Sequence, residues 1–280
     1  MCSRVFAAVV LLSLLRISGG AVERLKPEDL VAKHLEALGT PEARARYETC
    51  IANGTVTMGG LVGGGVGELT GKLSILSDGG KVRVGMQFPS KSFPGDHYAF
   101  DGSEVTVSAI QAGTRSMVGA FLYQNSYLVS EGVLSGVLTT NWALLHVDQR
   151  KPKLSYKGVK KVGEKRYHAL GYRPRKGGDE VDITFLFDPE TFRHCKSELR
   201  YEARNQIASD PAASARQADN TLVITEDFES FQTVEGLNLP SIYRIEANLT
   251  GARTLVYRWL LTLNEFFINK PIDPSYFKVS

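Results

Sequence analysis

The chain has 280 residues, of which 43% are hydrophobic and 22% are charged, and this composition excludes an intrinsically disordered protein. It is long enough to bury one sizeable core. The formal net charge is +3, and the sequence contains no basic patch that would indicate a nucleic-acid partner.

The first 21 residues have the layout of a secretory signal peptide. A short basic start precedes an apolar run over residues 5–15, and small residues at positions 18–21 suit cleavage. The run is too short to span a bilayer, which disfavours a membrane anchor. We therefore expect residues 1–21 to be removed and residues 22–280 to form a single domain that does not span the membrane after cleavage.

Two helices are predicted at the start of the mature chain. Pro27–Leu38 begins with proline and two acidic residues, and Val31, Leu35 and Leu38 share one helical face. Gly39 marks the end of this helix. Thr40 then serves as the N-cap of a second, short helix that has proline at its first position.

From Cys50 onward the pattern changes to the period of two that is typical of half-buried strands. Apolar and polar residues alternate over residues 82–88, 181–187 and 255–263. Residues 227–246 predict a β-hairpin, because aromatic and branched residues flank a Glu-Gly turn. Short turns between such strands favour an antiparallel meander.

One apolar segment breaks this pattern. Between residues 116 and 147 Glu131 is the only charged residue, and helical spacing relates Val133, Leu134, Val137, Leu138, Trp142 and Leu145. We expect two apolar helices joined near Glu131, forming an insertion over residues 117–146 that packs as a lid or plug against the sheet. Residues 205–220, rich in small and polar side chains, are predicted to form a mobile surface loop.

No catalytic or metal-binding pattern is present. The five histidines do not have metal-ligand spacing, and although His97, His168 and His194 fall in strand regions where they could meet, scattered histidines are the favoured interpretation. The sequence lacks the Gly-x-Ser-x-Gly elbow, and the acidic pair Glu226 and Asp227 is interpreted as solvated charge beside a turn. We therefore expect no enzyme, no cofactor and no bound metal.

The two cysteines of the mature chain, Cys50 and Cys195, leave two alternatives open. In an oxidising compartment they could form a disulfide, but buried free thiols fit the sequence as well, and neither residue has a local nucleophile signature.

The apolar face of a single antiparallel sheet has to be covered. If the sheet curls, the apolar face becomes a pocket wall for a hydrophobic ligand and the insertion becomes its lid. If side chains of the insertion fill the space, the same residues form a dry core, and the pattern is identical in the two cases. The candidate ligand-binding residues are Val82, Val84, Met86, Phe88, Leu134, Leu138, Phe185, Phe187, Tyr257 and Trp259.

Several segments, in this order along the chain, resemble the LolA/LolB-type lipoprotein carrier superfamily in its outer-membrane lipoprotein-sorting branch. They are LVAKHLEALGTPEARARYETCIANGTVTM, KVRVGMQFP with AFDGSEVTV, FLFDPETFRHCKSELR, DFESFQTVEGLNLPSIYRIE and NEFFINKPIDPSYF. The resemblance implies a mainly β, α+β fold. Its curved antiparallel sheet would form an incomplete half-barrel of about eleven strands, with the N-terminal helices and the central insertion covering the concave face.

The resemblance also implies a function. It predicts a periplasmic binding protein or carrier for lipids or for the acyl chains of lipoproteins, involved in outer-membrane lipoprotein sorting in a Gram-negative bacterium. The alternative is a non-enzymatic envelope sensor or protein-interaction domain of the same fold, with an envelope protein as its partner. A third hypothesis is a hydrolase, and substitution of His168 and His194 is the test of it.

Overall fold

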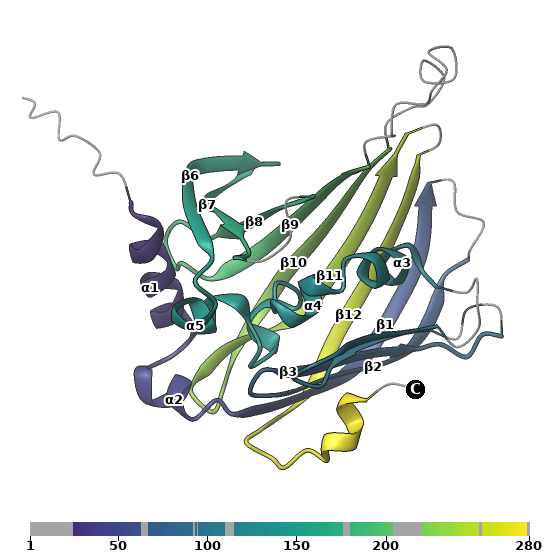
Figure 1. The fold of residues 1–280 in the computed structure, drawn as a ribbon, viewed down its shortest axis with the longest axis horizontal. Helices are drawn as coiled ribbons and strands as arrows, with labels where there is room; N and C mark the ends of the chain where they lie inside the picture. Colours follow the sequence, from purple (N-terminus) through teal and green to yellow (C-terminus); the bar gives the residue numbers. More distant parts are fainter. Residues whose placement is uncertain are drawn as a thin grey trace, which may run out of the picture.

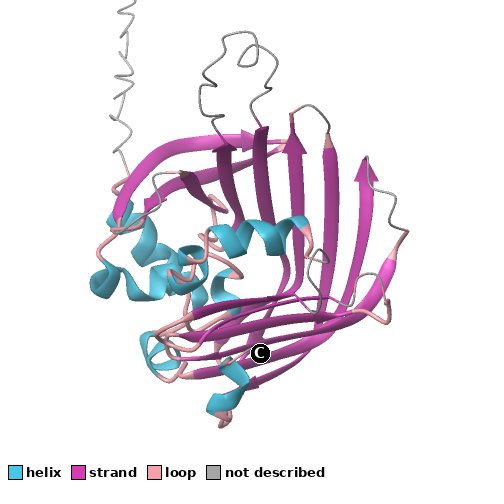
Figure 2. Cartoon of the chain, turned by 45° about the vertical axis from the view of Figure 1, so that its right-hand side comes forward, coloured by secondary structure: helices cyan, strands magenta, loops and turns pink. Residues whose placement is uncertain are grey.

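The fold is a single antiparallel sheet of twelve strands that curves around helices on one side. A computed structural model describes residues 25–62, 67–91, 93, 95–109, 115–175, 180–203, 220–251 and 254–278. The strand order is β5-β4-β3-β2-β1-β12-β11-β10-β9-β8-β7-β6, with β5 and β6 at the two edges, so the sheet does not close. Figures 1 and 2 show helices α1 to α5 on its concave side.

The twelve strands follow the chain as a meander that is interrupted only by the insertion. The first five are β1 (Thr49–Val62), β2 (Leu69–Asp78), β3 (Lys81–Gln87), β4 (Gly95–Phe100) and β5 (Val105–Ala109). The other seven are β6 (Lys153–Val162), β7 (Lys165–Arg173), β8 (Val181–Phe187), β9 (His194–Ala203), β10 (Asn220–Val234), β11 (Leu237–Thr250) and β12 (Leu255–Ile268). β1 pairs with β12, so the first and last strands lie at the centre of the sheet.

The helical elements are short. They are α1 (Pro27–Leu38), α2 (Pro41–Ala45), α3 (Met117–Gln124), α4 (Tyr127–Ser130), α5 (Val147–Arg150) and the 3-10 helices η1 (Gly136–Leu138), η2 (Ala143–His146) and η3 (Pro274–Phe277). In Figure 1, η3 lies below β2 and β3, on the opposite side of the sheet from the other helices. Among the described residues, none of the helices combines the length and the apolar character that crossing a membrane requires.

The N-terminal helices form as the sequence predicts. α1 ends at Leu38, and the N–H of Gly39 donates to the carbonyl oxygen of Leu35. The Thr40 hydroxyl accepts a hydrogen bond from the N–H of Ala43 at 3.2 Å and so caps α2. The predicted hairpin is also confirmed, since β10 and β11 join through a turn at Glu235 and Gly236, both with positive φ.

The central insertion differs from the two helices that its spacing predicts. Only α3 and α4 are α-helical before Glu131, and the segment that follows consists of turns and the short helices η1 and η2. Gly132, Ser135 and Gly136 all have positive φ, which an α-helix cannot accommodate. A Cβ at Gly132 would lie 1.8 Å from the carbonyl oxygen of Asn141, so the chain folds back on itself at this point.

Other expectations are corrected only slightly or lie outside the described residues. The sheet has twelve strands rather than about eleven. The predicted signal peptide and nearly all of the predicted loop at residues 205–220 fall outside the described part of the chain.

Candidate functional site

The concave face of the sheet is built from cross-strand rows of side chains. One row, here called the middle row, comprises Phe185, Ser197, Glu226, Ile245 and Trp259 on the five strands β8, β9, β10, β11 and β12. A second row, here called the top row, comprises Val181, Tyr201, Leu222, Leu249 and Leu255. Each of these residues lies four positions from the middle-row residue of the same strand. Because side chains alternate between the faces of a strand, every second residue belongs to this wall.

The part of the insertion after α4 fills the space in front of the middle row. Its backbone is joined to the sheet and to the segment before β1: Tyr47 donates to the carbonyl oxygen of Val137 at 3.0 Å, and the N–H of Thr140 donates to the Ser77 hydroxyl at 2.9 Å. A void between Val82 on β3 and this segment has a volume of only about 10 Å³. That is about the space of a single water molecule. The centre of the concave side is therefore packed.

An aromatic cluster locks the insertion against α1 and the strands β8 and β9. Trp142 is fully buried, and its Nε1–H donates to Nε2 of His34 at 3.1 Å. Nδ1 of His34 therefore carries the proton and donates to the carbonyl oxygen of Phe192 at 3.2 Å. The ring of His194 stacks on Trp142 with 4.7 Å between the centroids. Burial lowers the pKa of His34 to about 4 and that of His194 well below its usual value, so both rings are neutral at pH 7.

Glu226 is the ionisable member of the middle row and is completely enclosed. Its Oε1 accepts a hydrogen bond from the N–H of Ser135, in the insertion, at 2.9 Å, and another from the hydroxyl of Tyr243. The Ser135 hydroxyl lies 3.4 Å from that of Tyr98 on β4. Burial raises the pKa of Glu226 to about 7, against the effect of the two hydrogen bonds. The carboxyl group of Glu226 thus connects the insertion to strands β10 and β11.

Helix α3 crosses the open side of the half-barrel. Its N-terminus is held at β4, where Oδ1 of Asp96 accepts a hydrogen bond from the N–H of Ser116 at 3.2 Å. From there α3 packs along β5 and β4. Strand β9 lies on the other side of the central strands β1 and β12, and there the Phe121 ring contacts that of Tyr201 edge-on, with 5.9 Å between the ring centroids. Figures 1 and 2 show α3 as a strap in front of the long strands.

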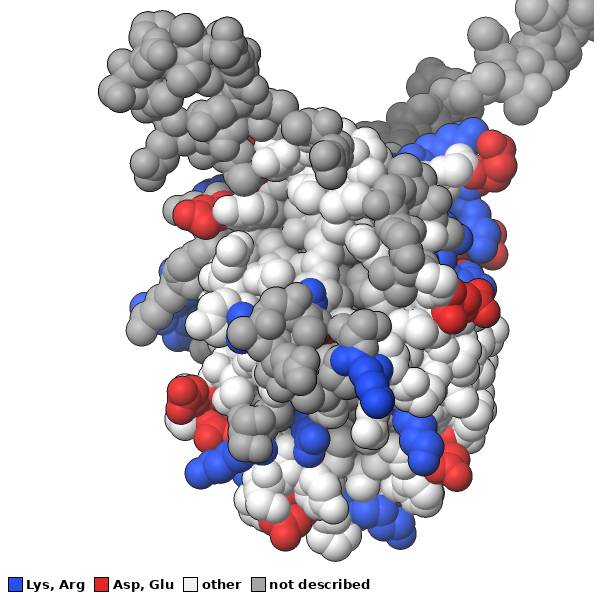
Figure 3. Space-filling view, turned by 90° about the vertical axis from the view of Figure 1, so that its right-hand side faces the viewer, with Lys and Arg blue, Asp and Glu red and all other residues white. Residues whose placement is uncertain are grey.

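Apolar wall continues beyond the packed centre. In the top row Tyr201, Leu249 and Leu255 are half-buried, and so is the neighbouring Tyr257 on β12. Figure 3 shows the molecule from the right-hand side of Figure 1, and the upper part of this view is largely uncharged between the segments drawn in grey. The indole Nε1 of Trp259 is buried without a hydrogen-bond partner among the described residues. Tyr201, Leu249, Leu255 and Tyr257 form the part of the wall that retains unused apolar surface.

The structure places all ten sequence-predicted ligand-binding residues on the concave side. Nine of them belong to one buried core cluster, and the tenth, Tyr257, is half-buried and packs against it. Phe185 and Phe187 contact the aromatic cluster, with ring centroids 4.7 Å from Trp142 and 5.0 Å from His34. They contact the insertion and α1 instead of lining an open cavity, and their role in binding a ligand stays a prediction.

Sequence reasoning missed the buried polar residues of this side. The interpretation of Glu226 as solvated charge is wrong, because Glu226 is 1% exposed, whereas its neighbour Asp227 forms a salt bridge with Lys196 on the convex face. The period of two that puts Leu222, Ile224 and Phe228 on the concave face also assigns Glu226 to it, so the alternation was the available indication.

The histidines and cysteines form no reactive centre in the described part of the chain. His97 lies on the convex face of β4, far in the strand order from His168 on β7 and His194 on β9, so the three do not meet. Among the described residues no group of three or more His, Cys, Asp or Glu could hold a metal ion. Cys50 and Cys195 are both free thiols, on strands β1 and β9 that are separated by three others.

Comparison with solved structures finds similar proteins at low sequence identity. A LolA superfamily protein from Nitrosomonas europaea is 12% identical with a TM-score of 0.49, and the alignment covers 91% of this chain and 98% of the other. A DUF1329 family protein from Desulfovibrio piger is 11% identical with a TM-score of 0.44, covering 91% and 98%. A putative outer membrane lipoprotein-sorting protein domain from Vibrio parahaemolyticus is 11% identical with a TM-score of 0.38, covering 88% and 97%.

The first of these structures bears the name of the superfamily that the sequence resembles, and the third bears the name of its lipoprotein-sorting branch. No protein-family profile matches the chain, and no curated protein matches it in sequence.

Proposed function

We propose that this chain is a periplasmic binding protein or carrier that holds an acyl chain of a lipid or lipoprotein against the top row of the concave face, beneath α3. The observation that carries this proposal is the half-buried apolar surface of Tyr201, Leu249, Leu255 and Tyr257, which continues the wall beyond the packed centre. Secretion to the periplasm is part of the proposal and is supported by the layout of residues 1–21.

In this proposal the two parts of the insertion, helix α3 and the segment after α4, have different roles. The segment after α4 is fixed by buried hydrogen bonds at Ser135, Val137 and Thr140 and acts as a permanent core. Helix α3 buries Val118, Phe121 and Leu122, and the Phe121 ring contacts Tyr201, so α3 is held there by apolar side chains that an acyl chain can replace. In this proposal, α3 moves away from Tyr201 when the ligand enters.

The energetics of such an exchange are favourable. Each acyl methylene that leaves water contributes about 0.8 kcal/mol, so eight of them supply about 6 kcal/mol before the costs of binding and of moving α3. Release then follows when α3 returns to its contact with Tyr201.

The proposal is tested with a pair of variants on β11. Leu249→Glu puts a charge into the top row, whereas Asn248→Glu adds the same charge to the convex face of the same strand. We expect the protein to bind a fluorescent 16-carbon fatty acid with 1:1 stoichiometry, Leu249→Glu to weaken that binding by about tenfold or more, and Asn248→Glu to leave it within about twofold. Absence of binding to the unmodified protein, together with native mass spectra free of co-purified lipid, would overturn the proposal.

The packed centre favours a second candidate, a non-enzymatic sensor or protein-interaction domain. A void of about 10 Å³ at Val82 leaves no preformed room for a ligand there. A stoichiometric protein partner recovered from envelope extracts, with no fatty-acid binding, is the result that this candidate predicts and the carrier does not.

A further inference from the structure

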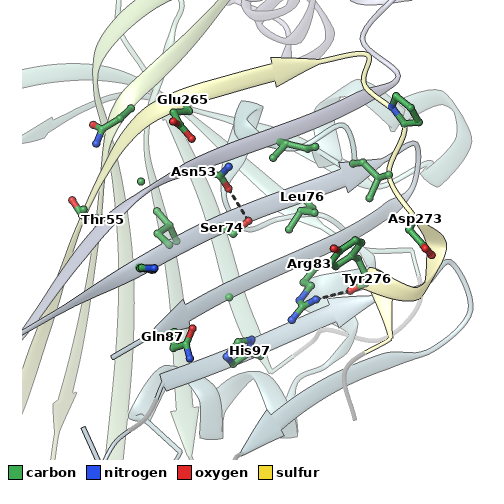
Figure 4. Close-up of a pocket in the computed structure, with 18 residues that line it drawn as sticks. Asn53, Thr55, Ser74, Leu76, Arg83, Gln87, His97, Glu265, Asp273 and Tyr276 are labelled. Atoms are coloured by element: carbon green, nitrogen blue, oxygen red, sulfur yellow. Dashed lines mark hydrogen bonds between the residues drawn. The ribbon is translucent and has the colours of Figure 1, made fainter. Parts of the chain in front are cut away.

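A wide cavity lies on the convex face, on the opposite side of the sheet from the insertion. It has a volume of about 810 Å³ and is formed by β1, β2, β3, β4 and β12 together with the C-terminal segment at residues 271–276. Pockets that hold small molecules have volumes of about 300–1,000 Å³. Figure 4 shows the side chains that line it, with those of β1 to β4 on the floor and the C-terminal segment at one side.

The floor is hollow because its central row has a glycine where a side chain would otherwise stand. Asn53, Ser74, Gly85 and His97 are cross-strand neighbours on β1 to β4. A Cβ at Gly85 would lie 3.0 Å from Nδ1 of His97, so the imidazole ring leans over the bare backbone of β3. The Ser74 hydroxyl donates to Oδ1 of Asn53 at 2.9 Å, which fixes the other half of the row.

A β-bulge shapes the end of the floor at β12. The pairing with β1 shifts between Asn53 and Gly54, so that Asn53 pairs with Glu265 and Gly54 with Leu263. The intervening residue, Asn264, is unpaired, and as a result Asn264 and Glu265 are both exposed on this face.

The C-terminal segment forms a fixed wall. Nη1 of Arg83 donates to the carbonyl oxygen of Tyr276 at 3.2 Å, as Figure 4 shows. Oδ1 of Asp273 accepts a hydrogen bond from the N–H of Ser275 at 2.8 Å and caps η3. Phe277 is 1% exposed and anchors the segment to the sheet.

The charges of the groove are separated along the strand order. Lys72, Arg83 and His97 lie on β2, β3 and β4, whereas the two carboxylates of the groove, Glu265 and Asp273, lie on β12 and in the C-terminal segment. Neither Lys72 nor Arg83 forms a salt bridge with a carboxylate of the described residues, and Nδ1 of His97 is buried without a hydrogen-bond partner among them. Lys72 and Arg83 form no salt bridge with the two carboxylates of the groove, so these two cations and the imidazole of His97 favour an anion at the β2–β4 side of the cavity, away from Glu265.

Apolar surface stands beside these donors. Ile51 and Leu76 are neighbours on the floor, Leu76 pairs with Arg83, and Ile272 and Tyr276 belong to the wall. A ligand whose charged group reaches Arg83 can therefore place an apolar group against Leu76 and Tyr276.

We propose that this convex groove binds a small amphipathic anion, with its carboxylate or phosphate at Arg83, His97 and Lys72 and its apolar part against Ile51, Leu76 and Tyr276. The site is distinct from the concave wall and does not depend on acyl-chain binding there. Burial and the neighbouring Arg83 lower the pKa of His97, so the imidazole contributes as a neutral hydrogen-bond donor at pH 7.

The probe is phenyl phosphate, which carries the anion and an apolar ring but lacks an acyl chain. Titration followed by NMR of the full chain should give saturable binding with a Kd below about 1 mM, and shifts on β2, β3 and β4. Benzyl alcohol, which has the ring alone, and inorganic phosphate, which has the anion alone, should each bind at least about tenfold more weakly. Equal binding of either compound would overturn the amphipathic assignment.

Two variants locate the site. Arg83→Gln should weaken phenyl phosphate binding about tenfold or more, whereas Arg244→Gln, which removes the same charge from the convex face of β11 outside the groove, should change it less than about twofold. Leu249→Glu on the concave face should leave it unchanged. The proposal is overturned if phenyl phosphate binding to the unmodified protein does not saturate below about 10 mM. It is also overturned if Arg83→Gln unfolds normally and binds phenyl phosphate as tightly as the unmodified protein. Neither result bears on the concave carrier site.

Discussion

Replacing Glu226 by glutamine should change the way in which stability depends on pH. The carboxyl group is fully buried, and burial raises its pKa from 4.5 to about 7. Between these two values the folded protein keeps a proton that the unfolded chain has released, so the free energy of unfolding falls as the pH rises through this window. Below pH 4.5 the penalty is absent, and above about pH 7 it is complete.

The size of the effect follows from the shift in pKa. One unit corresponds to 1.36 kcal/mol, so the ionisation of Glu226 removes about 3 kcal/mol of stability between pH 4.5 and pH 8. The glutamine of Glu226→Gln cannot ionise, and its oxygen can still accept from the N–H of Ser135 and the hydroxyl of Tyr243. A less favourable hydrogen bond would cost about 1 kcal/mol at every pH.

The assay is urea unfolding of both proteins at pH 5, 6, 7 and 8. We expect the stability of Glu226→Gln relative to the unmodified chain to increase by about 2.5 kcal/mol from pH 5 to pH 8, because the first part of the effect occurs below pH 5. The difference between the two proteins is needed because His34 acts in the opposite direction. Its pKa is lowered from 6.5 to about 4, so its contribution to stability is lost as the pH falls through that range.

The control is Glu229→Gln, three residues further along β10, where the carboxylate is exposed and pairs with Arg244 at 2.6 Å. Its effect should stay below about 1 kcal/mol at each pH, as is usual for exposed ion pairs. A stability difference for Glu226→Gln that is constant from pH 5 to pH 8 would refute the assignment of Glu226 as a buried carboxyl group that is neutral below pH 7.

Three further outcomes are expected. Gly132→Ala should destabilise the protein by more than about 2 kcal/mol in urea unfolding, because its φ is +65° and a Cβ would meet a backbone oxygen, whereas Gly158→Ala, with φ +84° in open space, should cost about 1 kcal/mol. Asp96→Ala should raise the hydrogen-exchange rates of α3 amides but not of α1 amides, and equal rates in α3 would contradict its anchoring role. Without reductant, Cys50 and Cys195 should both react with a thiol reagent after unfolding. Fewer than two reactive thiols from these residues would show that they form a disulfide.

The regular elements of this fold could be predicted because their determinants are local. Pro27, Gly39 and Thr40 fix the helix boundaries through backbone geometry and capping, which neighbouring residues alone decide. The alternation over residues 82–88 and 255–263 likewise defines two faces of a strand, and the turn at Glu235 and Gly236 joins a hairpin. These patterns also identified which apolar side chains belong to the concave side.

The filling of the concave side could not be predicted, because a pocket wall and a core wall have the same sequence pattern. Helical spacing from Val133 to Leu145 gave the wrong secondary structure, since backbone groups in this segment bond to Ser77 and Glu226, far away in sequence. Tertiary hydrogen bonds here outweigh a weak helical preference.

The convex groove also depends on tertiary structure. Gly85, His97 and Glu265 are unremarkable along the chain, and only the strand order brings them, with the C-terminal segment, to one cavity. The sequence by itself determined the strands, the hairpins and their apolar faces, because these depend on residues a few positions apart. The tertiary structure decided where space remains, because that depends on how side chains from distant strands and from the insertion pack against each other.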